Sequence, residues 1–178
     1  MSRSIATRTG DDGSTTLLYG QRVDKSHPQV EAIGTYDELN VALGTAKAMS
    51  PDEGVKANLA ILQKALVALM GELACAEEDV PRYLESKFSK VEDSDLALLD
   101  QGVADLEAKG LEFSGWATPG ANPLAASFDQ ARVTARRAER RLIALREHDR
   151  APRALLVKFT NRLSDYLWLL AREAEQTK

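Results

Sequence analysis

The sequence predicts an all-α protein, an up-and-down bundle of five helices behind a non-helical leader. Apolar residues recur at steps of three and four in five separate stretches, and strand patterns are almost absent. Breaks rich in proline and glycine separate these stretches. Because 178 residues fit one domain of ordinary size, we expect a single domain over 1–178, with a loop at 1–26 and the bundle at 27–178.

The leader and the first two helices follow from local signals. Residues 1–26 combine glycines, hydroxyl side chains and turn-forming aspartates, which predict a loop or a short hairpin. From Pro28 to about Met49 the pattern is helical, until Ser50 and Pro51 interrupt it. A second helix is expected from about Asp52 to Glu77. Its apolar row consists of Leu59, Leu62, Leu66, Leu69 and Leu73.

The last three helices are separated by breaker residues. Residues 80–89 are expected to form an irregular connection, and a third helix with Leu96, Leu99, Val103 and Leu106 on one face should end near Gly110. After a structured loop, Asn122 and Pro123 supply an N-cap and a first-turn proline for the fourth helix. Its row is Leu124, Phe128, Ala131, Ala135, Ala138, Leu142 and Leu145. A fifth helix after Pro152 carries Leu156, Phe159, Leu163, Tyr166 and Leu170.

Composition excludes several classes of function. The net charge of −4 argues against a uniformly basic, nucleic-acid-coating surface. A single cysteine, Cys75, excludes an internal disulfide framework and a multi-thiolate zinc site, and we expect it in the core. Neither histidine has the Glu-x-x-His spacing of a di-iron bundle. No uninterrupted apolar run of membrane-spanning length is found, so we expect a cytoplasmic protein without a membrane partner.

Positive charge is concentrated on the fourth helix and the turn after it. Residues 132–150 hold seven arginines and three acidic residues, a local net charge of +4 in a chain of −4. Arg132, Arg136, Glu139 and Arg140 share one helical face, and arginine forks of this kind suit phosphate oxygens. The alternative is a solvated face on which Glu and Arg pair along the helix, and spacing alone favours that alternative.

Two further features are ambiguous on their own. Asp37 lies in an apolar stripe, so it either finds an arginine from another helix or subunit, for which Arg132 is the candidate, or points to water at the edge of the stripe. The segment from Thr7 to Thr16, with Lys25 after it, has the ingredients of an anion-cradling loop but matches neither a Walker A motif nor GxGxxG, and a mobile N-terminus is the simpler explanation.

Five motifs in this order resemble the PduO-type ATP:cob(I)alamin adenosyltransferase family over almost the whole chain. They are TRTGDDGSTT, then Lys25, then EAIGTYDELN, RVTARRAERR and FTNRLSDYLWLLAR. The resemblance implies a cobalamin adenosyltransferase-like (ferritin-like) bundle that forms a homotrimer with active sites between subunits. It also implies transfer of the 5′-deoxyadenosyl group of ATP to Co(I) of a corrinoid, giving adenosylcobalamin and tripolyphosphate, with Mg²⁺ assisting and a reductase as electron-donating partner.

The resemblance also assigns residues. ATP would be bound by a leader loop and by two helices, through Thr7, Arg8, Thr9, Gly10, Thr15, Thr16, Lys25, Arg136, Arg137, Ala138, Glu139, Arg140 and Asn161. The corrinoid would contact Trp116, Asp37 and Arg132, with Asp37 and Arg132 paired across a subunit boundary. Asp37, Arg132, Arg136 and Glu139 would be the catalytic set. No protein ligand for Mg²⁺ is implied, because the ATP phosphates would carry the ion.

One loop departs from the family pattern. Where relatives usually have Phe-Val-Leu-Pro-Gly-Gly, this chain has Trp-Ala-Thr-Pro-Gly-Ala, so that Trp116, Thr118 and Ala121 differ. The aromatic residue at the Trp116 position would crowd the lower face of the corrinoid and exclude its lower axial ligand, which makes cobalt easier to reduce to Co(I). Two other functions fit the residues: a non-enzymatic helical module that docks an acidic partner, and a nucleotide sensor without turnover.

Overall fold

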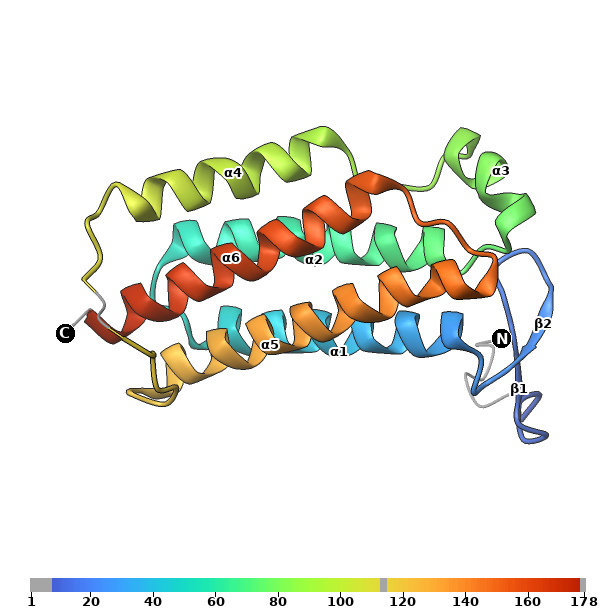
Figure 1. Cartoon of the computed structure of the whole chain (residues 1–178), viewed down its shortest axis with the longest axis horizontal. Coiled ribbons are helices and arrows are strands. Elements are labelled where there is room, and N and C mark those ends of the chain that lie inside the picture. Colours follow the sequence, from blue (N-terminus) through green and yellow to red (C-terminus); the bar gives the residue numbers. More distant parts are fainter. Residues whose placement is uncertain (1–7, 113–114, 177–178) are drawn as a thin grey trace, which may run out of the picture.

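Four long helices lie side by side, and a fifth covers one of them (Figure 1). The computed structural model describes residues 8–112 and 115–176. Helix α5 (Pro123–Ala144) packs against α6 (Ala154–Gln176) and α1 (Pro28–Met49), α1 packs against α2 (Glu53–Leu73), and α4 (Asp93–Glu107) lies along α6. The prediction of an up-and-down helical bundle is confirmed.

The predicted helix starts are built from capping side chains. The side chain of Asn122 accepts a hydrogen bond from the backbone N–H of Ala125 (2.8 Å), and Pro123 occupies the first turn of α5. Asp52 caps α2 in the same way through Val55 (2.9 Å). These bonds satisfy backbone donors that no helical carbonyl can reach, which is why the sequence signal was decisive.

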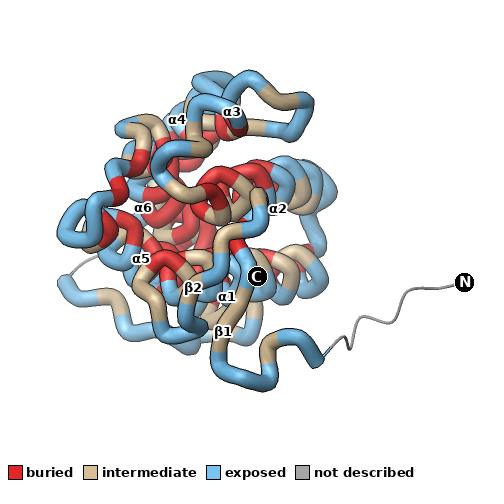
Figure 2. The backbone as a smooth tube through the Cα atoms, turned by 90° about the vertical axis from the view of Figure 1, so that its right-hand side faces the viewer, coloured by how far each residue is buried: buried red, intermediate tan, exposed pale blue. Residues whose placement is uncertain are grey.

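The core is made by the apolar rows that the sequence predicts (Figure 2). The five leucines of the α2 row are fully buried, and small residues such as Ala131, Ala135 and Ala138 allow α5 to approach its neighbours closely. Gly102 lets α4 approach α6, since a Cβ there would lie 2.7 Å from the Tyr166 ring. Cys75 is buried as expected, and burial raises the pKa of its thiol to about 11.

The connection after α2 differs from the prediction. Helix α2 ends at Leu73 rather than Glu77, and the carbonyls of Leu73 and Cys75 accept hydrogen bonds from Gln29. A short 3₁₀ turn, η1 (Glu77–Asp79), and a six-residue helix, α3 (Val80–Glu85), replace the irregular segment expected over 80–89. Tyr83 stabilises α3, because its hydroxyl lies 3.0 and 2.8 Å from the carbonyl oxygens of Ala68 and Ser89.

Ion pairs in which one partner is buried connect the turn between α5 and α6 to the end of α2. After α5 the chain forms a second 3₁₀ turn, η2 (Leu145–His148). The guanidinium of Arg153 binds both carboxylate oxygens of Glu72, at 2.9 and 2.6 Å. The side chain of Glu72 is 1% exposed. Arg150 donates to Glu77 (2.7 Å) and to the carbonyl of Glu72 (3.0 Å). This end of the bundle is therefore held by charge as well as by apolar packing.

The leader forms a hairpin at that same end (Figure 1). Strand β1 (Ser14–Thr16) pairs antiparallel with β2 (Arg22–Asp24), with Thr15 opposite Val23. The turn is attached to the bundle by a hydrogen bond from Leu18 to the carbonyl of Ala74 (2.8 Å) and by Arg82, which lies 4.0 Å from the centre of the Tyr19 ring.

Helix α2 is long and apolar enough, by length and composition, to cross a membrane. The core helix of a bundle passes the same test, and the leucine row of α2 is buried against other helices here.

Candidate functional site

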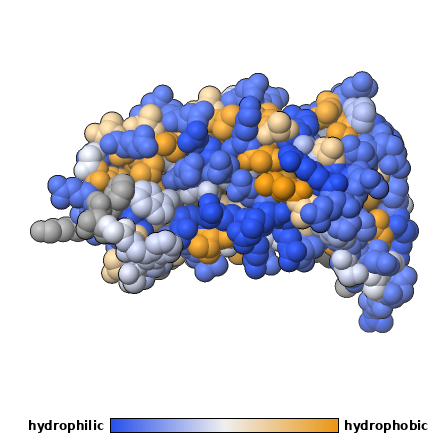
Figure 3. Space-filling model, viewed as in Figure 1, coloured by the Kyte–Doolittle hydropathy of each residue, from blue (hydrophilic) through white to orange (hydrophobic). Residues whose placement is uncertain are grey.

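The arginines of α5 fall into three groups by their contacts, and Figure 3 shows hydrophilic side chains along this helix, interrupted by hydrophobic ones. Arg137 forms an ion pair with Glu38, and Arg141 lies 3.4 Å from Glu31, so both are tied to α1. Arg136 and Arg140 are exposed and form no hydrogen bond or ion pair with any other residue of the described ranges. The fifth arginine, Arg132, binds Asp129 on α5 itself, so a paired charged face describes three of the five α5 arginines, two of them with partners from α1.

Glu139 lies beside a buried polar contact between three helices. The hydroxyl oxygens of Tyr36 on α1 and Thr160 on α6 are 2.8 Å apart. Burial raises the pKa of the Tyr36 phenol above its ordinary value, and the negative charge of Glu139 on α5 raises it further. Asn161 follows Thr160 and is exposed. The structure thus places Glu139 and Asn161 on elements that meet at the same contact.

Two basic side chains order the leader loop. Lys25 donates to the carbonyl of Gly10 (2.7 Å), and Arg22 donates to the carbonyl of Thr9 (3.3 Å). Arg22 also contacts Asp12 (3.2 Å). Hydrogen bonds from Ser14, with the charge of Arg22 as a smaller contribution, hold the pKa of the Asp12 carboxyl below its usual value.

The remaining predicted residues of the leader are placed around this loop. Arg8 is exposed and has a positive φ of 57°, and Thr15 and Thr16 belong to β1. Thr7 lies outside the described residues.

The loop and the free arginines are not joined by polar contacts within the described part of one chain. Both lie toward the end of the bundle where α1 begins, because Arg141 binds Glu31 in the first turn of α1 and the hairpin leads into that turn (Figure 1). No hydrogen bond or ion pair joins the described leader, 8–25, to Arg136 or Arg140. Within one chain, the described residues provide no polar contact that links the two halves of the predicted phosphate site.

Asp37 and Arg132 do not pair within the chain either. Asp37 is exposed on α1 and forms no ion pair in the part of the chain that the structure describes. Arg132 instead binds Asp129 on its own helix (Nε to Oδ1, 2.8 Å). Of the two alternatives for Asp37, the isolated chain shows the one in which it faces water, and a pair across a subunit boundary stays a prediction.

Arg132 and Trp116 line the same cavity, which has a volume of about 320 Å³. Trp116 is 94% exposed on the loop before α5, and it lines this cavity with Arg132, Trp168 and Arg172. The loop turns at Gly115 and Gly120, whose φ angles are 70° and 107° and suit glycine.

Two residues at this cavity were not predicted from the sequence: Arg172, which lines it, and Asp129, which does not line it but binds both of its arginines. Asp129 is 3% exposed and Arg172 is 2% exposed, and they bind each other at 2.6 Å. The spacing of Asp129, three residues before Arg132, was the available signal.

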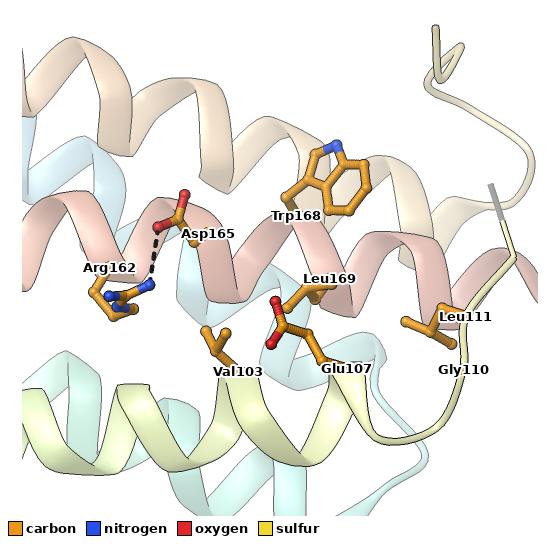
Figure 4. A pocket seen from close by; sticks show the side chains of 8 residues that line it. All are labelled: Val103, Glu107, Gly110, Leu111, Arg162, Asp165, Trp168 and Leu169. Atoms are coloured by element: carbon orange, nitrogen blue, oxygen red, sulfur yellow. Dashed lines mark hydrogen bonds and ion pairs between the residues drawn. The ribbon is translucent and has the colours of Figure 1, made fainter. Parts of the chain in front are cut away.

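A second cavity, of about 380 Å³, lies between α4 and α6 (Figure 4). Arg162 on its wall is already bound to Asp100 (2.7 Å) and Asp165 (3.5 Å). Trp168 lines both cavities, so they are neighbours on either side of one indole. The floor is mostly apolar, with Val103, Leu111 and Leu169.

Comparison with known proteins identifies the family. A family model described as cobalamin adenosyltransferase matches residues 5–174. The chain belongs to the cobalamin adenosyltransferase family. It is 41% identical over 173 residues to the corrinoid adenosyltransferase PduO of Salmonella typhimurium, covering 95% of this chain and 49% of that one. It is 36% identical over 177 residues to a corrinoid adenosyltransferase of Citrobacter freundii, covering 97% and 96%.

Solved structures of the family have the same fold. A variant of the PduO-type ATP:corrinoid adenosyltransferase from Lactobacillus reuteri, complexed with cobalamin and ATP, matches with a TM-score of 0.85 and 28% identity over 97% of this chain and 93% of that chain. Another variant of that enzyme, complexed with ATP, gives a TM-score of 0.84. The chain spans about half the length of the first curated relatives, the PduO proteins. The resemblance recognised in the sequence is thereby confirmed.

Proposed function

We propose that this chain transfers the 5′-deoxyadenosyl group of ATP to Co(I) of cobalamin or a related corrinoid, giving adenosylcobalamin and tripolyphosphate. Membership of the cobalamin adenosyltransferase family supports this activity, as do related structures that hold ATP and cobalamin. The observation that carries the proposal is the pair of exposed arginines, Arg136 and Arg140, which have no hydrogen bond or ion pair among the described residues and lie beside two arginines that are paired.

The ATP site would be shared between two copies of the chain in a homotrimer. Arg136 and Arg140 of one copy, with Arg137, Ala138, Glu139 and Asn161 around them, would bind the triphosphate. The leader of a neighbouring copy would close over it with Arg8, Thr9, Gly10, Thr15, Thr16 and Lys25, and with Thr7. Support comes from the lack of polar contacts between the two halves among the described residues of one chain, and from the capacity of free guanidinium groups to bind phosphate oxygens in a bidentate manner.

The corrinoid would lie against Trp116, Arg132 and the neighbouring copy's Asp37. Exposure of Trp116 beside Arg132 supports this assignment, because a large indole is available to crowd one face of a planar ring. Asp37 is exposed on the single chain and is therefore available to a second copy.

The reaction needs no nucleophile from the protein. Co(I) supplies the electron pair that forms the cobalt–carbon bond, while the bond from C5′ to the triphosphate oxygen breaks and tripolyphosphate takes the electrons of that bond. The protein would orient C5′ over the metal and spread the charge of the leaving group over Arg136 and Arg140. Glu139 would position a neighbouring arginine rather than act as a base, since no proton is transferred.

Mg²⁺ would arrive with ATP as part of the substrate. The described residues bring together no group of three His, Cys, Asp or Glu side chains that could hold a resident ion, so no step is assigned to a protein-bound metal. We place the enzyme in the cytoplasm as one domain, the leader loop and the bundle together, and a separate reductase would supply Co(I).

The direct test is an assay with ATP, Mg²⁺ and chemically reduced cobalamin. We expect the corrinoid spectrum to convert to that of adenosylcobalamin with release of one tripolyphosphate per turnover. Protein that binds ATP but leaves the corrinoid spectrum unchanged would instead favour a nucleotide sensor.

A further inference from the structure

Asp129 bridges two arginines in the wall of the Trp116 cavity. Its Oδ1 accepts a hydrogen bond from Nε of Arg132 at 2.8 Å, and its Oδ2 accepts one from Arg172 at 2.6 Å. The carboxylate is 3% exposed, so these two guanidinium groups replace the water it has lost. A buried carboxylate in such a place is costly unless it is paired on both oxygens.

The two hydrogen bonds of Asp129 fix the orientation of both arginine side chains. Arg132 binds Asp129 through Nε, whereas its two terminal nitrogens form no hydrogen bond or ion pair with the rest of the described chain, and the side chain is 22% exposed at the cavity. Arg172 is further held by Glu175 (2.9 Å), and its guanidinium lies 5.6 Å from the centre of the Trp168 ring. Nε of Arg172 is buried without a hydrogen-bond partner among the described residues, so its position depends on these few contacts.

We propose that Asp129 is a positioning residue of the corrinoid site. It orients Arg132 so that the terminal nitrogens of that arginine face a ligand or a second copy, and it holds Arg172 against Trp168. The inference rests on the proposed function, since the corrinoid is the ligand that this wall would bind. Asp129 touches no reacting atom; it acts through Arg132.

The chain offers a spectroscopic reporter for this cavity. Its only two tryptophans, Trp116 and Trp168, both line the cavity, so their emission responds to what binds there, although Trp168 also lines the neighbouring cavity. Aquacob(III)alamin has no Co(I) nucleophile and therefore measures binding without turnover. Titrations would be run with ATP and Mg²⁺ present and corrected with a free tryptophan derivative.

A double-mutant cycle separates positioning from general stabilisation. We expect Asp129→Asn to raise the Kd for aquacob(III)alamin by about tenfold in the wild-type background, the effect of one charge-assisted hydrogen bond. In an Arg132→Ala background the same substitution should change the Kd less than about twofold, because the residue it positions is gone. Equal fold-changes in both backgrounds would overturn the proposal.

A second measurement needs no corrinoid. The Nε–H group of Arg132 should give a proton–nitrogen NMR signal protected from exchange in the wild type and lost in Asp129→Asn. The matched control is Glu53→Gln, which breaks an exposed ion pair of the same i,i+3 spacing with Lys56 and should leave the signal and the Kd unchanged. An unprotected Arg132 signal in the wild type would overturn the proposal, whereas a protected signal without corrinoid binding would count against the proposed function alone.

Discussion

Arg141 of α5 lies 3.4 Å from the carboxylate of Glu31 in the first turn of α1. The neighbouring Arg137 is tied to α1 through Glu38, so two of the clustered arginines serve to join helices. Arg136 and Arg140 alternate with them along α5 and have no such partner in the described ranges. The division gives the phosphate proposal a matched pair of test residues.

Arg136→Ala should raise the KM for ATP by about tenfold or more, since a charge-assisted contact to phosphate contributes about 1.5–3 kcal/mol. The control, Arg141→Ala, removes a half-exposed ion pair and should lower the free energy of unfolding by no more than about 1 kcal/mol, with ATP kinetics unchanged. Steady-state kinetics at saturating corrinoid would check both. Wild-type ATP kinetics in Arg136→Ala would show that Arg136 does not contribute to ATP binding.

Asp37→Asn should impair the use of corrinoid and weaken assembly, because it removes the charge that would face Arg132 of a neighbouring copy. Since Asp37 is exposed on the single chain, the substitution should leave the folding of each chain intact. Corrinoid titration of the rate, with sedimentation to measure the oligomer, would test this. An unchanged corrinoid response with the oligomer intact would contradict the pairing.

The leader should become protected from protease when ATP binds. Arg8, Arg22 and Lys25 are exposed cleavage positions for trypsin in the free chain. If the leader closes over the triphosphate, ATP with Mg²⁺ should slow cleavage at these residues by roughly the ratio of free ligand to Kd. Mass spectrometry of the fragments would locate the cuts, and equal cleavage rates with and without nucleotide would argue against a lid.

Glu72→Gln should destabilise the bundle by about 1.5–3 kcal/mol, because it removes the charge of the buried partner of Arg153. The exposed pair between Glu53 and Lys56 provides the comparison, and Glu53→Gln should stay within about 0.5 kcal/mol of wild type. Urea unfolding of both variants measures the difference. Similar losses in the two would show that the ion pairs at the end of α2 contribute little.

Local signals in the sequence were sufficient for the bundle. The first helix and the start of α5 follow from an apolar period and from caps such as Asn122, which act within a few residues. Helix α3 could not be found in this way, because six residues with a proline carry too little periodicity, and the contacts of Tyr83 with distant carbonyls stabilise it.

The site was predictable in part for a related reason. Motif positions such as Arg136 were recognisable, but which arginines would be free depended on α1 carboxylates about a hundred residues away, as Arg137 and Glu38 show. The ion pair between Asp129 and Arg172 spans 43 residues of sequence and joins two helices, so no local sequence pattern predicts it. The signal from Asp37 was ambiguous, because the apolar stripe around it lies at a surface that the single chain leaves exposed.

The central claim is that the leader of one copy and the α5 arginines of another bind one triphosphate, and subunit mixing tests it most directly. Lys25→Ala and Arg136→Ala would each be made alone and then co-expressed, so that mixed oligomers form. We predict that each variant alone has little activity and that the mixture recovers roughly a quarter of the wild-type rate, because about one site in four then has both halves intact. A mixture no more active than its separate components would contradict the shared site.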